Sequence, residues 1–403
     1  MAHNRTVLGE FLSLVSRHEF EREARRHHRG RKLRSMSRWS QFVAMATAQL
    51  SGRCSLRDIV SNLDAQARKL YHLGVGRVAR SSLARVNEQQ PWEFYEVLFG
   101  RLLSRCRTKA PGHGFRFGNK LVSLDATYVS LCLELFPWAR YRETKGALKL
   151  HVGLDHAGGL PSFLQVTDGK GSDLEAARSL RLPTGSIVVA DRLYLDFGWL
   201  KDLDSQGVFL VTRLKRDVQY AVRERRTFAR GRGVTSDQTI VLTSDKGRRR
   251  CPIPLRRIGY RDKETGRFYE FLTNNFNLSP RTIADIYKAR WQIELFFKWI
   301  KQNLRIKSFV GTSRNAVMTQ IWVAMCVHLL LAYLKFSNKM SWTMSQILRL
   351  LQLNLFDRRP LLELFEPPDQ RPDPAGLELP RFRGQFEFRE SSSFAVALLE
   401  VDG

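Results

Sequence analysis

One helix-forming stretch, residues 287–301 (YKARWQIELFFKWIK), constrains the fold more than any other part of the chain. It follows Ser279 and Pro280, a cap and first-turn pair that favours the start of a helix. No Gly or Pro follows before Gly311, so we expect one continuous helix. Apolar residues occupy most of its circumference, which predicts a largely buried helix. They are Ile286, Ile293, Leu295, Phe296, Trp299 and Ile300.

A narrow polar stripe interrupts this apolar surface. On a wheel that turns by about 100° per residue, four polar side chains fall on the stripe. They are Tyr287, Arg290, Glu294 and Lys301. Two interpretations are open at this point. Arg290 and Lys298 both lie four residues from Glu294, which is the spacing of helix ion pairs. Alternatively, a carboxylate beside three groups that can bind phosphate forms a catalytic face.

The spacing of these residues, Tyr-x2-Arg-x3-Glu-x6-Lys, resembles the signature of one large branch of bacterial insertion-sequence transposases of the DDE class. In that family the Glu is the third metal-binding carboxylate of a ribonuclease-H-like catalytic domain. The resemblance therefore implies that Glu294 is catalytic. It also implies two further aspartates upstream, at the ends of strands.

Two aspartates meet that requirement. Residues 120–129 form a β-branched and apolar run that predicts a strand with Asp125 embedded in it, which is costly unless the carboxylate is paired or binds metal. The apolar run 186–190 predicts a parallel strand buried on both faces, and it ends at Asp191. Catalytic residues of open α/β sheets gather at such carboxyl ends. Asp191 is alternatively a helix N-cap. The motif ADRLY that contains Asp191 resembles the second-aspartate box of the family.

The resemblance implies that Asp125, Asp191 and Glu294 are both the catalytic residues and the metal ligands. Three carboxylates supply hard oxygen ligands, which suit Mg²⁺ or Mn²⁺, and two ions are expected. The implied reactions are hydrolysis at the ends of an insertion sequence and attack of the freed 3′-hydroxyl on target DNA. Arg290 and Lys301 would contact phosphates.

Several alternatives stay open. Tyr287 could hydrogen-bond a phosphate or stack on a base. Relatives that excise through a DNA hairpin use an aromatic wedge, for which Phe268 and Tyr269 are the candidates here. A ribonuclease-H-like nuclease would cut without joining, and an inactive DNA-binding descendant would have lost a carboxylate. His151 and His156 are candidate metal ligands by residue type, but lone histidines on strands more often have a structural role.

The charge balance favours nucleic acid as the partner. Of 403 residues, 66 are Lys or Arg and 39 are Asp or Glu, which gives a formal net charge of +27. A basic membrane-surface protein is the alternative, but no lipidation signal or basic amphipathic end helix supports it. The 5 scattered cysteines fit a reducing cytosol. The apolar run 321–334 is too short to span a membrane and predicts a buried core helix. We therefore expect a cytoplasmic, nucleoid-associated bacterial protein without a membrane partner.

The first part of the chain, residues 1–105, predicts helices and resembles the N-terminal domain that accompanies this branch. Its implied role is to recognise double-stranded DNA at the element's ends. A basic run at 18–34 and a candidate helix-turn-helix ending in 81–87 supply the cations. A solvated charged face is the alternative for the basic run. The candidate DNA contacts are Arg25, Arg26, Arg29, Arg80 and Arg85.

These observations predict an α/β protein with three parts. A helical end-binding domain at 1–105 precedes a ribonuclease-H-like DDE domain at 117–340, and a C-terminal helix with a Pro-rich tail occupies 341–403. A basic, β-rich insertion at 213–273 interrupts the catalytic domain, with short strands expected at 238–242, 256–260 and 268–273. A homodimer is expected in the complex with transposon ends and target DNA.

Overall fold

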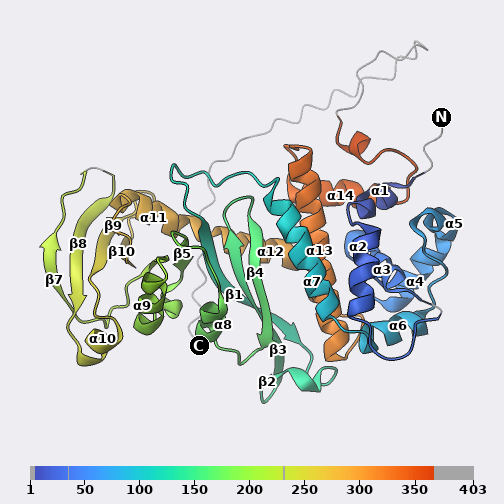
Figure 1. Ribbon diagram of the computed structural model, residues 1–403, viewed down its shortest axis with the longest axis horizontal. Helices are drawn as coiled ribbons and strands as arrows, with labels where there is room; N and C mark the ends of the chain where they lie inside the picture. Colours follow the sequence, from blue (N-terminus) through green and yellow to red (C-terminus); the bar gives the residue numbers. More distant parts are fainter. Residues whose placement is uncertain (1–4, 35, 230–231, 367–403) are drawn as a thin grey trace, which may run out of the picture. The chain divides into compact units, whose positions relative to one another are not determined.

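The computed structural model describes residues 5–34, 36–229 and 232–366 (Figure 1). The predicted Pro-rich tail lies outside the described residues, and so do two residues of the basic insertion.

Within the described residues, ten strands form one mixed sheet in the order β2-β3-β1-β5-β6-β10-β9-β8-β7, with β4 paired to β3 beside that path. The strands are β1 (Leu121–Leu131), β2 (Arg140–Arg142), β3 (Lys145–Asp155), β4 (Leu160–Asp168), β5 (Ile187–Ala190), β6 (Phe209–Arg213), β7 (Tyr220–Arg225), β8 (Val234–Leu242), β9 (Leu255–Arg261) and β10 (Phe268–Thr273).

The centre of the sheet is parallel. β5 pairs in parallel with β1 on one side and β6 on the other, and all of its residues are buried, as its continuous apolar run predicts. On the far side of β1 the pairing is antiparallel, from β1 to β3 and from β3 to β4. The strands predicted around Asp125 and before Asp191 are therefore confirmed.

The basic insertion continues this same sheet. β10 pairs antiparallel with β6, and β9, β8 and β7 follow outward (Figure 1). The three strands predicted in the insertion are present, but β7 and the short helix α10 (Asp245–Arg250) are not among the predictions. The sequence does not predict β7 because this edge strand has mostly exposed residues and little apolar alternation.

Helices cover the sheet and form the N-terminal part. Before β1 come α1 (Val7–Ser13), α2 (Arg17–Arg26), α3 (Arg38–Ser51), α4 (Leu56–Ala65), α5 (Ala67–Leu70), the 3₁₀ turn η1 (Tyr71–Leu73), α6 (Arg80–Gln89) and α7 (Glu93–Arg107). After β1 come η2 (Pro137–Ala139), α8 (Asp173–Ser179), η3 (Arg192–Tyr194), α9 (Phe197–Ser205), α11 (Pro280–Ala289), α12 (Gln292–Asn303), α13 (Arg314–Ser337), α14 (Met344–Asn354) and η4 (Leu362–Phe365).

One hydrophobic core joins the N-terminal helices to the later ones. It contains residues of α1 to α4, α6 and α7, of α12 to α14, and of β1, β3 and β4. α13 lies in this core, packed along α7 (Figure 1). By length and composition α13 is the one described helix that could cross a membrane, but 94% of its most apolar window is buried inside the protein. The prediction of a buried core helix is confirmed.

Two smaller cores flank the parallel strands. Residues of α8 and α9 pack with β5 and β6 in one cluster. Residues of α11 pack with alternate residues of the same strands in another. Because side chains alternate across a strand, α8 with α9 and α11 cover opposite faces of the sheet. This places α11 on one face of the parallel strands, and α12, which follows it, contacts β1.

The prediction of one continuous helix through 287–301 is wrong. α11 ends at Ala289 and α12 begins at Gln292. Between them the backbone bonds shorten to three-residue spacing: Arg290 N–H donates to Tyr287 O at 3.2 Å, and Glu294 N–H donates to Trp291 O at 3.0 Å. Such a tightening without Gly or Pro leaves no signal in the sequence. The predicted burial of Leu295 is also wrong, since 53% of it is exposed.

Part of the basic run is a helix. α2 begins because the Ser16 side chain accepts a hydrogen bond from Glu19 N–H, and its inner face buries Phe20, Glu23 and Ala24. The remaining cations of the run, from position 29 onward, follow the end of the helix.

Candidate active site

The two predicted aspartates directly follow the last residue pair of the parallel ladder between β1 and β5. In the register of β1 and β5, Leu124 stands opposite Ala190. Asp125, within β1, and Asp191, directly after β5, are the next residues along the chain, so both carboxylates lie where the parallel pairing ends. The alternative reading of Asp191 also holds, because its Oδ1 accepts a hydrogen bond from the Arg192 N–H at 2.5 Å and caps η3.

Arg290 connects the glutamate helix to the first aspartate. Its Nη2 donates to Glu294 Oε1 at 2.7 Å, and its Nη1 lies 3.4 Å from Asp125 Oδ2. Lys298, which has the same spacing to Glu294, is exposed and forms no ion pair with any described residue. The ion-pair interpretation is thus correct for Arg290. The ion pair does not exclude the catalytic interpretation, because Arg290 also contacts Asp125, one of the two predicted catalytic aspartates.

The surroundings of Asp125 make its ionisation difficult. Burial raises the pKa of Asp125 to about 6, and the negative charges of Glu294 and Asp191 add to this effect. A hydrogen bond from the Ala126 N–H, 2.8 Å from Oδ1, and the charge of Arg290 oppose it. A buried carboxylate among like charges is a group that gains from a bound cation.

This pKa predicts a pH dependence. Because only the ionised Asp125 can bind metal, the Mg²⁺ concentration for half-maximal cleavage should rise steeply as the pH falls below about 6. An unfolded Asp titrates near 3.9, so the raised pKa destabilises the metal-free fold at neutral pH and ceases to do so at low pH. Asp125→Asn should therefore raise the melting temperature of metal-free protein at pH 8 but not at pH 4. An equal shift at both pH values would contradict the assignment.

The other two residues of the stripe also reach the ends of these strands. The hydroxyl of Tyr287 lies 3.5 Å from Asp191 Oδ1, and burial followed by the Asp191 charge raises the pKa of Tyr287. Lys301 Nζ donates to the hydroxyl of Thr127 at 2.5 Å, two residues beyond Asp125 on β1. Burial lowers the pKa of Lys301. Tyr287, Arg290 and Lys301 thus each contact a side chain on or next to these strands, and Glu294 is joined to Asp125 through Arg290.

The sequence prediction missed a buried tyrosine beside the aspartates. Tyr194 lies in η3 and is 3% exposed. Burial raises the pKa of Tyr194 above its usual range, and the charges of Asp173, Asp125 and Asp191 raise it further. Its place in the ADRLY motif is the signal that could have identified it.

The histidines take part in structural contacts. His151 Nδ1 lies 3.2 Å from Asp173 Oδ1, and its Nε2 forms a 2.9 Å hydrogen bond with the Thr167 hydroxyl. Lys149 Nζ donates to the other oxygen of Asp173 at 2.7 Å. His156 is 6% exposed, and burial lowers its pKa to about 4. These contacts agree with the structural reading of both histidines.

The donor set fits a hard divalent cation. The charges of Glu294 and Asp191 both act on the half-buried Asp125, and carboxylate oxygens are the ligands that such cations prefer. In this conformation the guanidinium of Arg290 contacts two of the three. In the part of the chain that the structure describes, no three His, Cys, Asp or Glu side chains are grouped closely enough to hold an ion. Binding of metal would require the Arg290 contacts to loosen.

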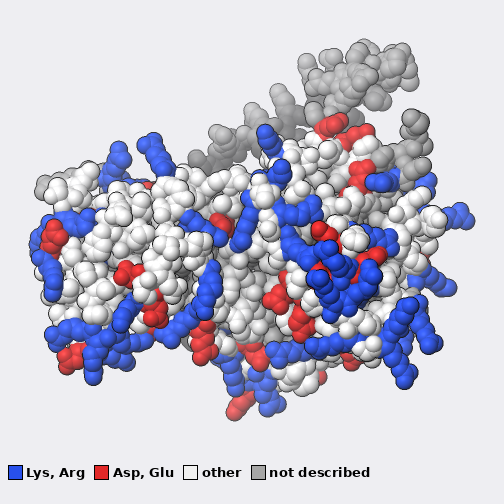
Figure 2. All heavy atoms as spheres, in the orientation of Figure 1, with Lys and Arg blue, Asp and Glu red and all other residues white. Residues whose placement is uncertain are grey.

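The predicted DNA contacts of the N-terminal part lie on its surface. Figure 2 shows Lys and Arg gathered around α2, with a few acidic atoms among them, and a second concentration over α10. Arg26 is not fully available to bind DNA, because its Nη1 donates to the buried Glu23 at 2.9 Å. All five predicted contacts are exposed: Arg25, Arg26, Arg29, Arg80 and Arg85.

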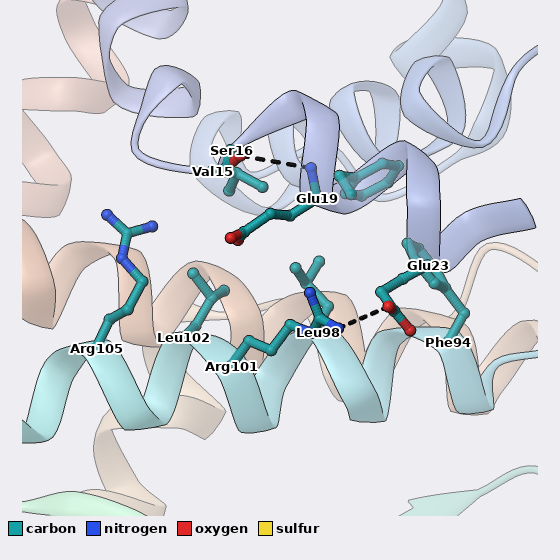
Figure 3. A pocket seen from close by; sticks show the side chains of 10 residues that line it. Val15, Ser16, Glu19, Glu23, Phe94, Leu98, Arg101, Leu102 and Arg105 are labelled. Atoms are coloured by element: carbon teal, nitrogen blue, oxygen red, sulfur yellow. Dashed lines mark hydrogen bonds and ion pairs between the residues drawn. The ribbon is translucent and has the colours of Figure 1, made fainter. Parts of the chain in front are cut away.

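An ion pair of the buried Glu23 connects the basic helix α2 to α7. Figure 3 shows Arg101 of α7 reaching Glu23 of α2, and the ion pair measures 2.6 Å. The adjoining cavity, between α2 and α7, has a volume of about 20 Å³, which is room for a single water molecule. It is therefore a packing feature and offers no ligand site.

The candidates for an aromatic wedge differ in accessibility. Phe268 is 50% exposed at the start of β10. Tyr269 stacks on Phe271 at 6.1 Å and lies beneath the guanidinium of Arg213 at 5.3 Å. Of the two, Phe268 has the ring that is free to contact another molecule.

Comparison with known proteins gives two family matches. The family described as "Transposase DDE domain" matches residues 116–330, which include all three carboxylates. A domain of unknown function, DUF4372, matches residues 3–76.

Similar proteins carry transposase names. A protein named transposase y4zB, from Sinorhizobium fredii, is 33% identical over 296 residues, covering 72% of this chain and 81% of that protein. A protein named as a transposase for insertion sequence element IS5377, from Geobacillus stearothermophilus, is 28% identical over 65% of this chain and 68% of its own length. Among solved structures, a piggyBac transposase synaptic complex with hairpin DNA aligns at a TM-score of 0.43 and 12% identity, over 86% of this chain and 75% of that one.

Proposed function

This chain belongs to the DDE-domain transposases, enzymes that act on DNA, and from that premise we propose which reactions it performs and with which residues. We propose metal-dependent cleavage at the ends of an insertion sequence, followed by transfer of the freed 3′-hydroxyl into target DNA. The observation that carries the proposal is the adjacency of Asp125 and Asp191 on parallel strands, with Arg290 linking Asp125 to Glu294.

The proposal includes a ribonuclease-H-like core within residues 117–340, in the branch with the Tyr-Arg-Glu-Lys signature. What supports it is the strand order β4-β3-β1-β5-β6, in which three antiparallel strands are followed by two parallel ones, with the aspartates on the first two parallel neighbours. The helical part at 1–105 and the C-terminal part at 341–403 remain proposed boundaries.

We propose that Asp125, Asp191 and Glu294 hold two Mg²⁺ or Mn²⁺ ions. Bound ions of this kind activate a water or 3′-hydroxyl and stabilise the leaving oxygen of an in-line displacement. The chain's own contribution is to place the carboxylates on rigid strands. The partial burial of Asp125 also keeps the site from being fully hydrated, and this strengthens its attraction for a cation.

The cationic residues have separate tasks in this proposal. Arg290 pairs with Asp125 and Glu294 in the structure, and with ions held by these carboxylates it would be available to bind a phosphate oxygen. Lys301 is held by Thr127, two residues beyond Asp125 on β1, where the backbone of the cleaved DNA strand would pass. Tyr287, whose ring packs on Phe271 at 4.9 Å, positions Asp191 through its hydroxyl.

The remaining assignments concern partners. The N-terminal helices would recognise the element's ends through the exposed cations of α2 and α6, a homodimer would hold two ends, and the site of action would be the nucleoid in the cytoplasm. The basic surface around α2 supports binding of a polyanion.

A joining assay tests the proposal. A precleaved end with a free 3′-hydroxyl should be joined to plasmid DNA with Mg²⁺ and without any nucleotide cofactor, because the phosphodiester energy is conserved in the exchange. Cleavage of uncut ends without joined products in Mg²⁺ or Mn²⁺ would identify a nuclease. Binding without either reaction would identify an inactive descendant. Glu294→Gln, assayed in parallel, shows whether any joining depends on this site.

A further inference from the structure

A short basic segment lies between α2 and α3. We call residues 28–34 the basic arm; its sequence is HRGRKLR. Four of its side chains are exposed cations, and they form no hydrogen bond or ion pair with any residue that the structure describes. They are Arg29, Arg31, Lys32 and Arg34.

The cations of the preceding helix behave differently. Arg17 pairs with Glu21 at 2.9 Å, and Arg22 and Arg26 pair with Glu23 at 4.0 and 2.9 Å. The positive charge of α2 is thus partly neutralised within the protein. The charge of the basic arm is left for another molecule.

The arm is fixed to the end of α6. The buried side chain of Gln90, which follows α6, donates to Arg29 O at 2.8 Å and accepts from Arg29 N–H at 3.4 Å. A hydrogen bond of 3.1 Å between His28 Nε2 and Arg31 O tightens the turn. Gly30, at its tip, has φ +76° and no atom within 4 Å of where a Cβ would stand. The arm is therefore a narrow, tethered turn with an arginine on each side of an exposed glycine.

α6 presents its own exposed face beside the arm. A groove of about 770 Å³ lies between them, lined on the α6 side by residues that include Arg85 and Gln89. Exposed side chains run along the helix and leave Leu83 and Val86 inside. They are Arg80, Ser81, Arg85, Glu88 and Gln89. Arginine, glutamine and glutamate are side chains that read base edges in a major groove.

We propose that the basic arm enters the minor groove of the element's end while α6 lies in the neighbouring major groove. This inference rests on the proposed function, in which the N-terminal part binds those ends. Three features carry it: unpaired arginines, a glycine tip small enough to approach the floor of a narrow groove, and attachment to a helix that displays base-reading side chains. Arginine is favoured in narrow minor grooves because their negative potential is enhanced. A helix in one groove with an arm in the next is an established way of binding DNA.

The test changes the minor groove alone. The full chain is titrated, in Mg²⁺-free buffer, with duplexes of the terminal repeat that brackets this reading frame. In successive short blocks, 2,6-diaminopurine replaces adenine or hypoxanthine replaces guanine. The first adds and the second removes the amino group that distinguishes base pairs in the minor groove, and neither alters the major-groove pattern. At one block we expect addition of the amino group to weaken binding by about tenfold, and its removal to leave binding equal or stronger.

Two matched variants complete the test, each losing two arginines. Arg29→Ala/Arg31→Ala should abolish the dependence on the amino group. Arg22→Ala/Arg26→Ala should retain it, and this variant keeps α2 attached because Arg101 still pairs with Glu23. Two results would contradict the insertion of the basic arm into the minor groove. One is that the affinity of wild-type protein does not depend on the amino group in any block. The other is that the affinity of the Arg29→Ala/Arg31→Ala variant depends on the amino group as strongly as that of the wild type. Equal binding of the repeat and of a scrambled duplex would instead overturn end recognition by the N-terminal part, and the arm with it.

Discussion

Asp125→Asn, Asp191→Asn and Glu294→Gln are each expected to lower Mg²⁺-dependent cleavage of end-containing DNA by a factor of about 10³ or more. The physical reason is that each variant removes an anionic oxygen ligand from a set of three, while the strands and helix that hold the set remain. Binding of the uncut end, measured by anisotropy in Ca²⁺, should change little. The cleavage rate under single-turnover conditions is the quantity to compare.

A matched control comes from α9. Asp202 is an exposed aspartate of the same domain, and Asp202→Asn loses the same charge without touching the strand ends. It should cleave at the wild-type rate. If any of the three variants also retained that rate with a native melting curve, its residue would not be a metal ligand.

The second large effect concerns Arg290. Arg290→Gln should slow cleavage by about 10²-fold, because it removes a charged donor that would act on the phosphate in the transition state. It should not weaken Mg²⁺ binding, since it also removes the cation that contacts Asp125 and Glu294 in the free enzyme. A merely structural role would instead lower the rate and the metal affinity together.

Lys298 provides the comparison for Arg290. It has the same four-residue spacing to Glu294 but is exposed and forms no ion pair among the described residues. Lys298→Gln should leave the cleavage rate and the Mg²⁺ requirement unchanged. If Lys298→Gln and Arg290→Gln behaved alike, a general loss of positive charge on α12 would explain both.

Two large apolar side chains at and just after the break between α11 and α12 are exposed. Trp291 and Leu295 are 57% and 53% exposed, although a continuous buried helix was predicted there. The tightened turn between α11 and α12 rotates the start of α12. Tyr287 of α11 reaches Asp191, and Arg290, which caps α11, contacts both Asp125 and Glu294 of α12. Wheel geometry assumes one regular helix, so it could group the four residues but not predict their contacts.

The sequence alone determined the identity of the candidate site. A carboxylate inside the apolar strand of Asp125, a second at the end of the buried run before Asp191, and the spacing around Glu294 are local patterns. A charged residue within an apolar strand can be recognised in the sequence as a candidate site residue, because burying its charge is costly unless the charge is paired or binds metal. The strands before Asp191 and around Asp125 and the buried α13 followed from apolar runs in the sequence, and α6 covers the candidate helix at 81–87.

Only the tertiary structure decided what these elements contact. The register that sets Leu124 opposite Ala190 brings two aspartates together that are 66 positions apart in the chain. The choice of Arg290 over Lys298 as partner of Glu294, and the continuation of the central sheet into the insertion, likewise depend on packing between distant segments. So does the contrast between the paired arginines of α2 and the unpaired ones of the basic arm, because Glu23 is held inside by Arg101 of α7. Such contacts depend on which distant segments pack together and which charges they bury, so no local sequence pattern predicts them.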